Sequence, residues 1–258
     1  MRQHGLSFDH NLHALRIVED FELRYAAFRG LNLTFEVREG IIKHSRDYDA
    51  AKFPELADYL LDRRPPLEAQ LIDWTDEIAY STADLDDGFE SRLLSLTQIN
   101  EGVPLFACFF AEVEKLYPDA VPKLQFNEVL RRMLDRWVGD LISNTRTQVE
   151  NSGCKTLDGI RSHSTRLVSL SDEAESERRQ TKEFLYANFY NCAALEPEKE
   201  AAGRTITDLF ELWMKQPEKL PASYQEKAAA EPLPRVICDY LAGMTDNYIY
   251  EQYEKHCG

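Results

Sequence analysis

The sequence predicts an all-α protein, an irregular bundle of many helices. Apolar residues recur at helical spacing along most of the 258 residues. Strand signals are poor, because no alternating β-branched run is bounded by an Asn-Gly or Asp-Gly turn. Hydrophobic residues make up 43% of the chain, which is enough to bury a substantial core. The expected architecture is therefore helix packed on helix.

Glycines and prolines mark the ends of the expected helices. Gly30 precedes the second helix, and Pro65 and Pro66 open the long fourth one, since prolines are tolerated in a first turn. The stretch 100–104 closes that helix. In chain order, the expected helices cover residues 9–24, 31–45, 54–62, 66–95, 104–117, 122–151, 172–192, 195–216 and 233–256.

Two stretches lack helical periodicity. Residues 152–171 are rich in Ser, Thr and Gly, which predicts an exposed loop or a short hairpin. Residues 216–234 contain four prolines and predict a connector with about one turn of helix. No internal repeat is visible.

Charge and composition argue against several classes of protein. The net charge is −15, whereas a general nucleic-acid binder would show a basic patch or stripe. A few local cations can still hold an anionic small ligand. No apolar run approaches the length of a membrane span, and the first residues do not resemble a signal peptide. We therefore expect no membrane partner.

The cysteines stand singly along the chain. The absence of a CxxC pair argues against a zinc knuckle or a redox motif. Their odd number and wide spacing suit reduced thiols in a cytoplasmic protein. We expect them to be small core residues rather than reactive thiols. They are Cys108, Cys154, Cys192, Cys238 and Cys257.

The segment from residue 68 to residue 89 has two different faces when drawn as a helix. The apolar face, with Leu71, Trp74, Ile78, Leu85 and Phe89, is expected to pack in the core. The opposite face gathers carboxylates around one phenol, although like charges at i and i+4 are mildly destabilising. Either water solvates this face or a positive group lies on it. This acidic face consists of Asp73, Asp76, Tyr80, Asp84 and Asp87.

The acidic face alone would supply only some of the ligands of a metal site and lacks the nitrogen ligands. One helix rarely supplies every ligand of a divalent cation, and catalytic metals usually take nitrogen or oxygen ligands from several elements. No histidine forms an HxxxH pair or an adjacent His-Asp pair. His10 and His13 are more simply interpreted as polar residues at a helix start than as ligands.

Four blocks of sequence occur in an order that indicates a family. They run from Phe8 to Val18, from Gly30 to His44, from Glu68 to Gly88 and from Asp239 to Asp246. The blocks resemble, in the same order, conserved segments of the HD-superfamily deoxynucleoside triphosphate triphosphohydrolases, the dGTPase-like proteins. The resemblance spans nearly the whole chain and implies the C-terminal portion of an HD-type bundle. Residues 1–150 would then be the remainder of the catalytic core, and residues 151–258 a C-terminal helical region.

The resemblance implies roles for five residues. Asp76 matches an aspartate that, with a His and a His-Asp pair, holds a divalent metal, expected to be Mg²⁺ or Mn²⁺. Tyr80 and Asp84 match residues that contact the deoxyribose, where the carboxylate accepts a hydrogen bond from the 3′-hydroxyl. Lys43 matches a lysine expected at the triphosphate. Asn11 lies in the segment that borders the nucleotide pocket.

Each matched residue also has a plainer interpretation. Without the resemblance, Asp76 is a solvated helix acid, Tyr80 a core residue and Asp84 part of an acidic surface. The resemblance favours the site roles for these three. Lys43 stays open between a phosphate contact and a cation that favours the C-terminal end of its helix. Asp73 and Asp87 are left as surface or structural acids.

The departures from the family pattern change the expected activity. The other three metal ligands of the family have no counterpart in this sequence, and His13 stands where a Gln is common. Tyr190 is not followed by the His and Pro that the family often carries. We therefore expect a truncated dNTP triphosphohydrolase, an enzyme that cleaves a dNTP into deoxynucleoside and triphosphate, inactive as this chain alone.

The alternative is a non-catalytic nucleotide-binding or oligomerisation module, which leaves open whether the chain is an enzyme. The expected partners are a dNTP, further copies of the chain in a homo-oligomer, and a separate N-terminal polypeptide that carries the other ligands. Without the family's N-terminal helices, apolar surface would be exposed, and this predicts self-association.

Overall fold

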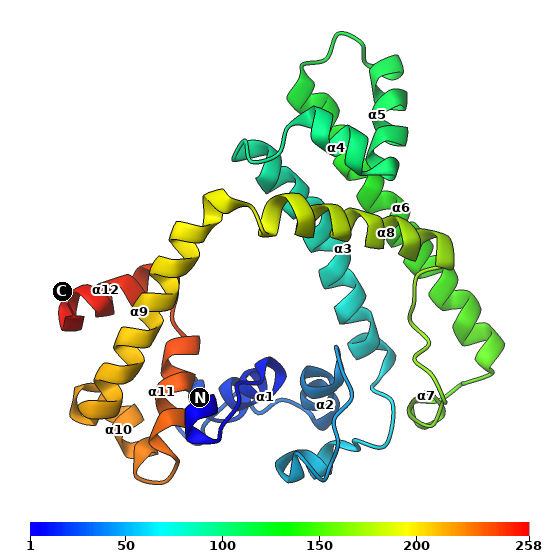
Figure 1. Ribbon diagram of the computed structural model, residues 1–258. Coiled ribbons are helices and arrows are strands. Elements are labelled where there is room, and N and C mark those ends of the chain that lie inside the picture. Colours follow the sequence, from blue (N-terminus) through cyan, green and yellow to red (C-terminus); the bar gives the residue numbers. More distant parts are fainter. Residues whose placement is uncertain (258) are drawn as a thin grey trace. The chain divides into compact units, whose positions relative to one another are not determined.

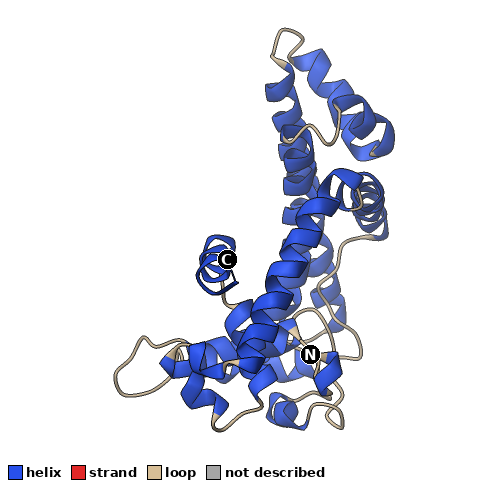
Figure 2. Ribbon diagram, turned by 60° about the vertical axis from the view of Figure 1, so that its left-hand side comes forward, coloured by secondary structure: helices blue, strands red, loops and turns tan. Residues whose placement is uncertain are grey.

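The expected all-α fold is confirmed. The computed structural model describes residues 1–257, Arg2 by its backbone alone, and this part of the chain contains helices and no strand (Figures 1 and 2). Short π-helices follow α1 at Ile17–Phe21 and α8 at Tyr186–Tyr190. The α-helices are α1 (His10–Arg16), α2 (Phe35–Lys43), α3 (Leu67–Glu90), α4 (Leu96–Gly102), α5 (Pro104–Leu116), α6 (Pro122–Ser152), α7 (Leu157–Arg161), α8 (Asp172–Leu185), α9 (Glu196–Lys215), α10 (Ala222–Ala228), α11 (Leu233–Ala242) and α12 (Asp246–Cys257).

The chain forms two compact units, each with its own core. The larger unit comprises Ile17–Cys192, and the smaller unit joins Met1–Arg16 to the residues from Ala193 onward. The expected division after residue 150 falls in the last turns of α6. That division concerned the catalytic core of a longer family protein, and it stays a prediction.

The core of the larger unit lies between α3, α5, α6 and α8. Phe106, Phe126 and Trp137 are fully buried there, and the rings of Phe89 and Phe126 stack with centroids 4.3 Å apart. Leu71 does not join this core and is exposed. The first turn of α3 instead buries Ala69, beside Gly40 of α2, and Gln70, which corrects the expected apolar face.

Several expected helices have different ends. The long fourth helix stops at Glu90, and α4 begins at Leu96 after the N-cap residue Ser95, which forms a capping box with Gln98. The last expected helix is split into α11 and α12 by Gly243–Thr245. The expected helix 54–62 is a 3₁₀ helix, Pro54–Tyr59, ended by the left-handed Leu60 at φ 51°. These breaks depend on capping and packing that periodicity does not reveal.

The Ser- and Gly-rich stretch 152–171 is not an exposed loop throughout. It contains α7, and the residues after α7 lie against α3, with Leu167 and Val168 buried. Gln70 Oε1 accepts hydrogen bonds from the amides of Leu167 (2.7 Å) and Val168 (3.2 Å). The indole of Trp74 donates to the Val168 carbonyl at 3.0 Å. Buried polar groups on α3 therefore fix this stretch.

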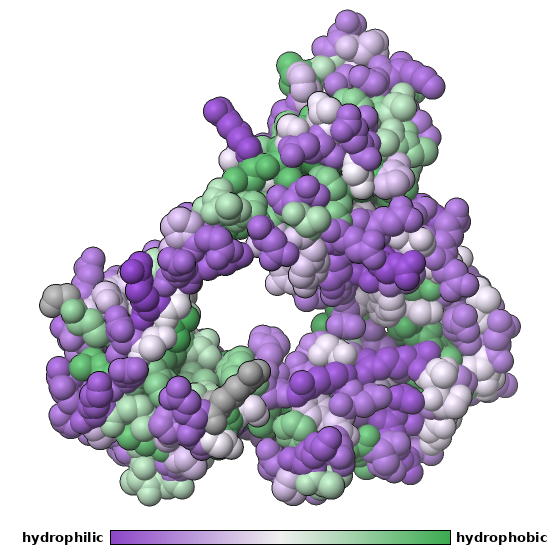
Figure 3. Space-filling model, viewed as in Figure 1, coloured by the Kyte–Doolittle hydropathy of each residue, from purple (hydrophilic) through white to green (hydrophobic). Residues whose placement is uncertain are grey.

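The cysteines are not core residues, which corrects another expectation. All five are free; Cys108 and Cys257 are exposed and the others half-buried. The surface shown in Figure 3 is largely hydrophilic. Within residues 1–257, every helix is too short or too polar to cross a membrane.

The smaller unit is built around Trp213 and Ile237, which are fully buried between α9 and α11. The buried carboxylate of Asp239 ties α1 to α11. It lies 3.1 Å from His13 Nδ1 and accepts hydrogen bonds from the Arg16 guanidinium at 2.6 and 3.0 Å. Charge-assisted bonds of this kind are roughly twice as strong as neutral ones.

Gly30 provides a test of the backbone path after α1. Its φ is +74°, and a Cβ there would lie 2.3 Å from the Glu19 carbonyl oxygen. We expect Gly30→Ala to destabilise the protein by about 3 kcal/mol, from left-handed strain and the clash together. Gly5→Ala is the matched control, because Gly5 has φ +68° and open space around it. It should lose only about 1 kcal/mol in urea unfolding. Equal losses of stability in the two variants would contradict a steric clash at Gly30.

Candidate functional site

The acidic face of α3 is turned away from the core because its other face is anchored there. Ile78 and Leu85 are at most 1% exposed. Tyr80 and Asp84 follow Asp76 by one and two helical turns, so the three residues lie in a row along the outer side of α3. Tyr80 is 58% exposed, which excludes the interpretation of Tyr80 as a core residue.

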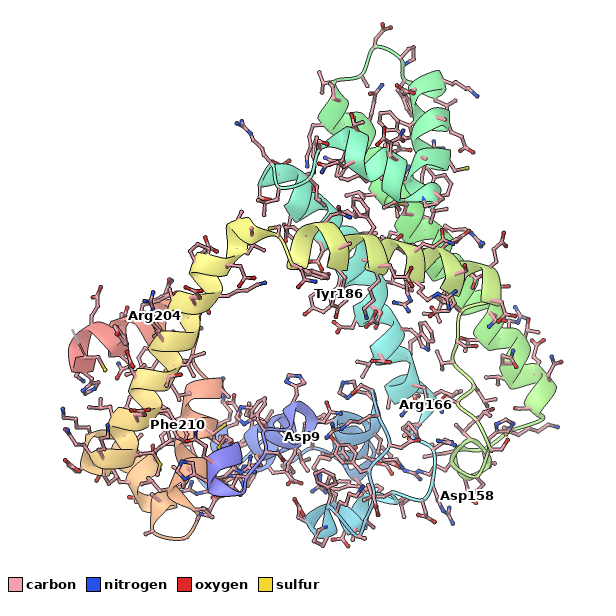
Figure 4. The ribbon with its side chains drawn as sticks, viewed as in Figure 1. Asp9, Asp158, Arg166, Tyr186, Arg204 and Phe210 are labelled. Atoms are coloured by element: carbon pink, nitrogen blue, oxygen red, sulfur yellow. The ribbon has the colours of Figure 1, made fainter. Side chains whose placement is uncertain are left out.

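A pocket forms where α8 and the π-helix after it cross α3. Figure 4 shows Tyr186 at this crossing. The pocket has a volume of about 240 Å³, and an adjoining pocket of about 460 Å³ shares Lys182 and Tyr186 with it. Tyr80 and Asp84 both line the smaller pocket, and their predicted contact with a deoxyribose stays a prediction. It is lined by Glu77, Tyr80, Ser81, Asp84, Lys182, Leu185, Tyr186 and Tyr190.

Asp84 is oriented by a phenol from the π-helix. The hydroxyl of Tyr190 donates a hydrogen bond to Asp84 Oδ2. Burial, together with this bond, raises the pKa of Tyr190, so the phenol stays protonated and remains a donor. The carboxylate is thereby held at the pocket wall. Its other oxygen, Oδ1, is an acceptor suited to a ligand hydroxyl.

Glu77 joins α3 to α8 through two cations. Lys182 Nζ donates to its two carboxylate oxygens at 2.6 and 2.7 Å, and Arg178 donates at 2.6 Å. Arg178 also lies over the Trp74 ring, 5.7 Å from the centroid. The Glu77 charge is therefore balanced within the protein, and Lys182 is fixed at the edge shared by the two pockets.

The remaining acids of α3 differ in environment. Asp73 is half-buried, and burial, followed by the charge of Glu77, raises the pKa of its carboxyl group. Asp76 is exposed. Residues 1–257 contain no group of three or more His, Cys, Asp or Glu side chains arranged to hold a metal ion. A single carboxylate does not hold Mg²⁺ or Mn²⁺, so these residues do not fit the family's metal site on their own.

Lys43 lies apart from this pocket, in a buried ion cluster at the end of α2. Its ammonium donates to Glu39 Oε1 at 3.0 Å and to the carbonyls of Tyr59 (3.3 Å) and Leu60 (2.8 Å). Arg161 also pairs with Glu39. Burial lowers the pKa of Lys43. These contacts favour a structural role, because a phosphate would have to displace Glu39.

Asn11 is buried in α1 of the smaller unit, next to Asp9, whose carboxylate accepts a hydrogen bond from the Leu12 amide at 2.9 Å. Its predicted place beside the nucleotide stays a prediction.

The sequence prediction missed the α8 side of the pocket. Lys182, Tyr186 and Tyr190 recur at intervals of four, which places them near one face of a helix. Arg179, an exposed cation, lines the adjoining pocket. The four-residue spacing was the available signal. It pointed to no partner, because nothing in the sequence shows that α8 crosses α3.

Comparisons with known proteins identify a family and several relatives. Residues 168–255 match a family described as a phosphohydrolase-associated domain. Over 256 residues, the chain is 39% identical to a deoxyguanosinetriphosphate triphosphohydrolase-like protein of Thiobacillus denitrificans, covering 99% of this chain and 67% of that protein. A protein of the same description from Azoarcus sp. is 41% identical, with 99% and 66% covered. One from Geobacter sulfurreducens is 36% identical, with 96% and 64% covered. The chain spans about two thirds of the length of these curated relatives.

The structural role of Lys43 is testable by its effect on stability. We expect Lys43→Ala to lower the free energy of unfolding by about 3 kcal/mol, because it leaves Glu39 buried with one cation fewer. The control is Lys52→Ala, because the Lys52 side chain is 76% exposed and its ammonium lies as far as 4.0 Å from the carboxylate of Asp49. That variant should change stability little. Urea unfolding measures the free energy of unfolding of both variants. If Lys43→Ala did not change it, the interpretation of Lys43 as a phosphate contact would be favoured instead.

Proposed function

The chain belongs to the deoxyguanosinetriphosphate triphosphohydrolase-like family of phosphohydrolases, and we propose that it supplies the nucleotide-holding part of a dNTP triphosphohydrolase site. The supporting observation is the pocket in which Tyr80 and Asp84 of α3 meet Lys182 and Tyr190. In the proposed reaction, water attacks the α-phosphorus and the bond to the 5′-oxygen breaks. The products are a deoxynucleoside and triphosphate.

The sugar end of the nucleotide is assigned to Tyr80 and Asp84. Asp84 accepts a hydrogen bond from the 3′-hydroxyl, while Tyr190 holds its other oxygen. The exposed ring of Tyr80 packs against the sugar face. A charged acceptor fixed by a neighbouring donor discriminates a ligand with a hydroxyl from one without it, because the unpaired acceptor would lose a charge-assisted bond.

The phosphate end is assigned to the cations of α8. Arg179 and Lys182 line the adjoining pocket, in a chain whose net charge of −15 otherwise repels a triphosphate. Unlike the buried Lys43, Lys182 is 38% exposed, and its ammonium has a third N–H to donate while it stays paired with Glu77. We assign Lys43 a structural role at the end of α2. A phosphate contact would be assigned to it only if Lys43→Ala left the stability of the protein unchanged. Asn11 is proposed to border the nucleotide in the complete site.

Asp76 is proposed as one oxygen ligand of a divalent metal, Mg²⁺ or Mn²⁺. Its place one turn before Tyr80 supports this assignment, since the metal then lies next to the sugar contacts. The other ligands are not among the described residues. We therefore propose that this chain binds a nucleotide but does not hydrolyse it alone, in a cytoplasmic setting that keeps its thiols reduced.

The sugar contact is testable with a nucleotide that lacks the 3′-hydroxyl. We expect the chain to bind dGTP about tenfold more tightly than 2′,3′-dideoxy-GTP, and Asp84→Asn to remove most of that difference. Asp87→Asn, an exposed acid of the same helix, is the matched control and should retain it. Titration calorimetry measures each affinity. An Asp84→Asn protein that still discriminates would show that the 3′-hydroxyl binds elsewhere.

The absence of hydrolysis is testable directly. The 258-residue chain, incubated with dGTP and Mn²⁺, should release no triphosphate, because one carboxylate does not make a metal site. Nucleotide binding that persists after chelation of metal would support the nucleotide-holding role. Metal-dependent release of triphosphate would overturn the proposal of an inactive chain, and failure to bind any dNTP would overturn the nucleotide-holding role.

A further inference from the structure

A polar pocket lies between the loop that leads into α3 and the turn that follows α7. Its volume is about 410 Å³, and Figure 4 shows this part of the larger unit between the labels of Asp158 and Arg166. Its lining residues are distinct from those of the two pockets at the crossing of α3 and α8. Three arginines and two serines form most of the lining, and we call it the arginine pocket. They are Arg63, Arg64, Arg161, Ser162 and Ser164.

Two hydrogen bonds tie the walls of the arginine pocket to each other. The amide of Arg64 donates to the Arg161 carbonyl at 2.9 Å, and the Arg64 guanidinium donates to the Ser164 carbonyl at 2.8 Å. Pro65 and Pro66 follow at once, and each proline ring fixes its own φ. The cations are therefore held near one another before any ligand binds, which lowers the entropic cost of ordering them around it.

The arginines of the pocket have more N–H groups than their protein partners use. A guanidinium carries five N–H donors. Arg63 donates to Asp158 at 2.6 Å, Arg64 donates to Asp47 at 2.8 Å besides its bond to Ser164, and Arg161 donates to Glu39 through two of its nitrogens. Each guanidinium thus keeps N–H groups for a ligand.

The acidic partners of Arg63 and Arg64 are weak competitors for these donors. The side chain of Asp158 is 78% exposed and that of Asp47 58% exposed, and ion pairs in such positions contribute little. A phosphate monoester carries nearly two negative charges at neutral pH and three acceptor oxygens. Its geometry also matches the planar fork of a guanidinium, which favours bidentate pairing. A phosphate group is therefore the anion that fits three converging arginines.

The rest of the lining indicates what the phosphate is attached to. The pocket lies within the size range of small-molecule sites, larger than a bare phosphate needs. No Phe, Tyr or Trp is among its lining residues, so a nucleobase would find none of these rings to stack on. The carboxylate of Asp62, an exposed residue, offers acceptors for hydroxyl groups. Hydroxyls on a small polar molecule suit this lining.

We propose that the arginine pocket binds a phosphate monoester of a small polyhydroxy compound. The phosphate accepts hydrogen bonds from Arg63, Arg64 and Arg161, and a hydroxyl of the ligand donates to Asp62. Arg161 is the fixed member of the set, because its partner Glu39 is fully buried, whereas Arg63 turns from Asp158 to the ligand. This site does not depend on the proposed nucleotide-holding role, because the two sites share no residue.

The ligand class is testable by titration calorimetry of the 258-residue chain at constant ionic strength. Glycerol 3-phosphate, a phosphate monoester with two hydroxyls, should bind. Inorganic phosphate should bind about tenfold more weakly, because it lacks the hydroxyl bond to a carboxylate. Glycerol should not bind, since it lacks the charge that the arginines recognise. Absence of binding by glycerol 3-phosphate would overturn the proposal, and equal affinity for inorganic phosphate would overturn the assignment of an ester.

Two substitutions with opposite effects test the place of the site. Arg63→Gln should weaken the binding of glycerol 3-phosphate about tenfold, because it removes a charge-assisted bond to the phosphate. Asp158→Asn should strengthen the binding about threefold, because it removes the carboxylate that competes for Arg63. A purely structural ion pair would not produce this gain.

Arg131→Gln is the matched control, because Arg131 is an exposed arginine of α6, outside the lining of the arginine pocket. It should bind glycerol 3-phosphate like the unaltered chain, and urea unfolding checks that each variant is folded. A folded Arg63→Gln protein with unchanged affinity would overturn the proposal. So would an Asp158→Asn protein that binds no more tightly than the unaltered chain.

Discussion

The packing of α3 against α6 and α8 is the constraint on which the rest of the larger unit depends. One side of α3 is committed to the core by Ile78 and Leu85, and this turns its carboxylates outward. Like charges along a helix are unfavourable unless cations meet them. Arg178 and Lys182 of α8 pair with Glu77, so the contact that closes the core also balances one carboxylate beside the acidic face.

The two ends of the larger unit use buried polarity differently. At the crossing of α3 and α8, Glu77 and Asp84 line a pocket, and hydrogen bonds from α8 and the π-helix fix their orientation. At the end of α2, Glu39 and Lys43 are sealed from solvent, and their pairing serves the fold. Charges of the same type therefore line a pocket where water reaches them and stabilise the fold where it does not.

The sequence predicts the helices well and their mutual contacts poorly. Periodicity places both ends of α6 and the start of α3 to within one residue, because a long amphipathic pattern indicates directly which face is buried. It joins α11 to α12 and misses α4, since caps and the break at Gly243 are local features. The resemblance selects Tyr80 and Asp84, which the structure brings into one pocket. Tyr190 and Lys182 are missed because their partners lie about 105 residues away along the chain.

The π-helix at Tyr186–Tyr190 determines which way the pocket's last phenol points. A π-turn accommodates one residue more than an α-turn over the same path, and such turns are found mainly at functional sites. Each residue of an α-helix turns the chain by about 100°, so a helix that gains one residue presents a different face beyond that point. The direction of Tyr190 toward Asp84 is in this sense a matter of residue count as well as residue identity. Two relatives that share every side chain of this pocket but differ by one residue in this turn would have differently shaped pocket walls.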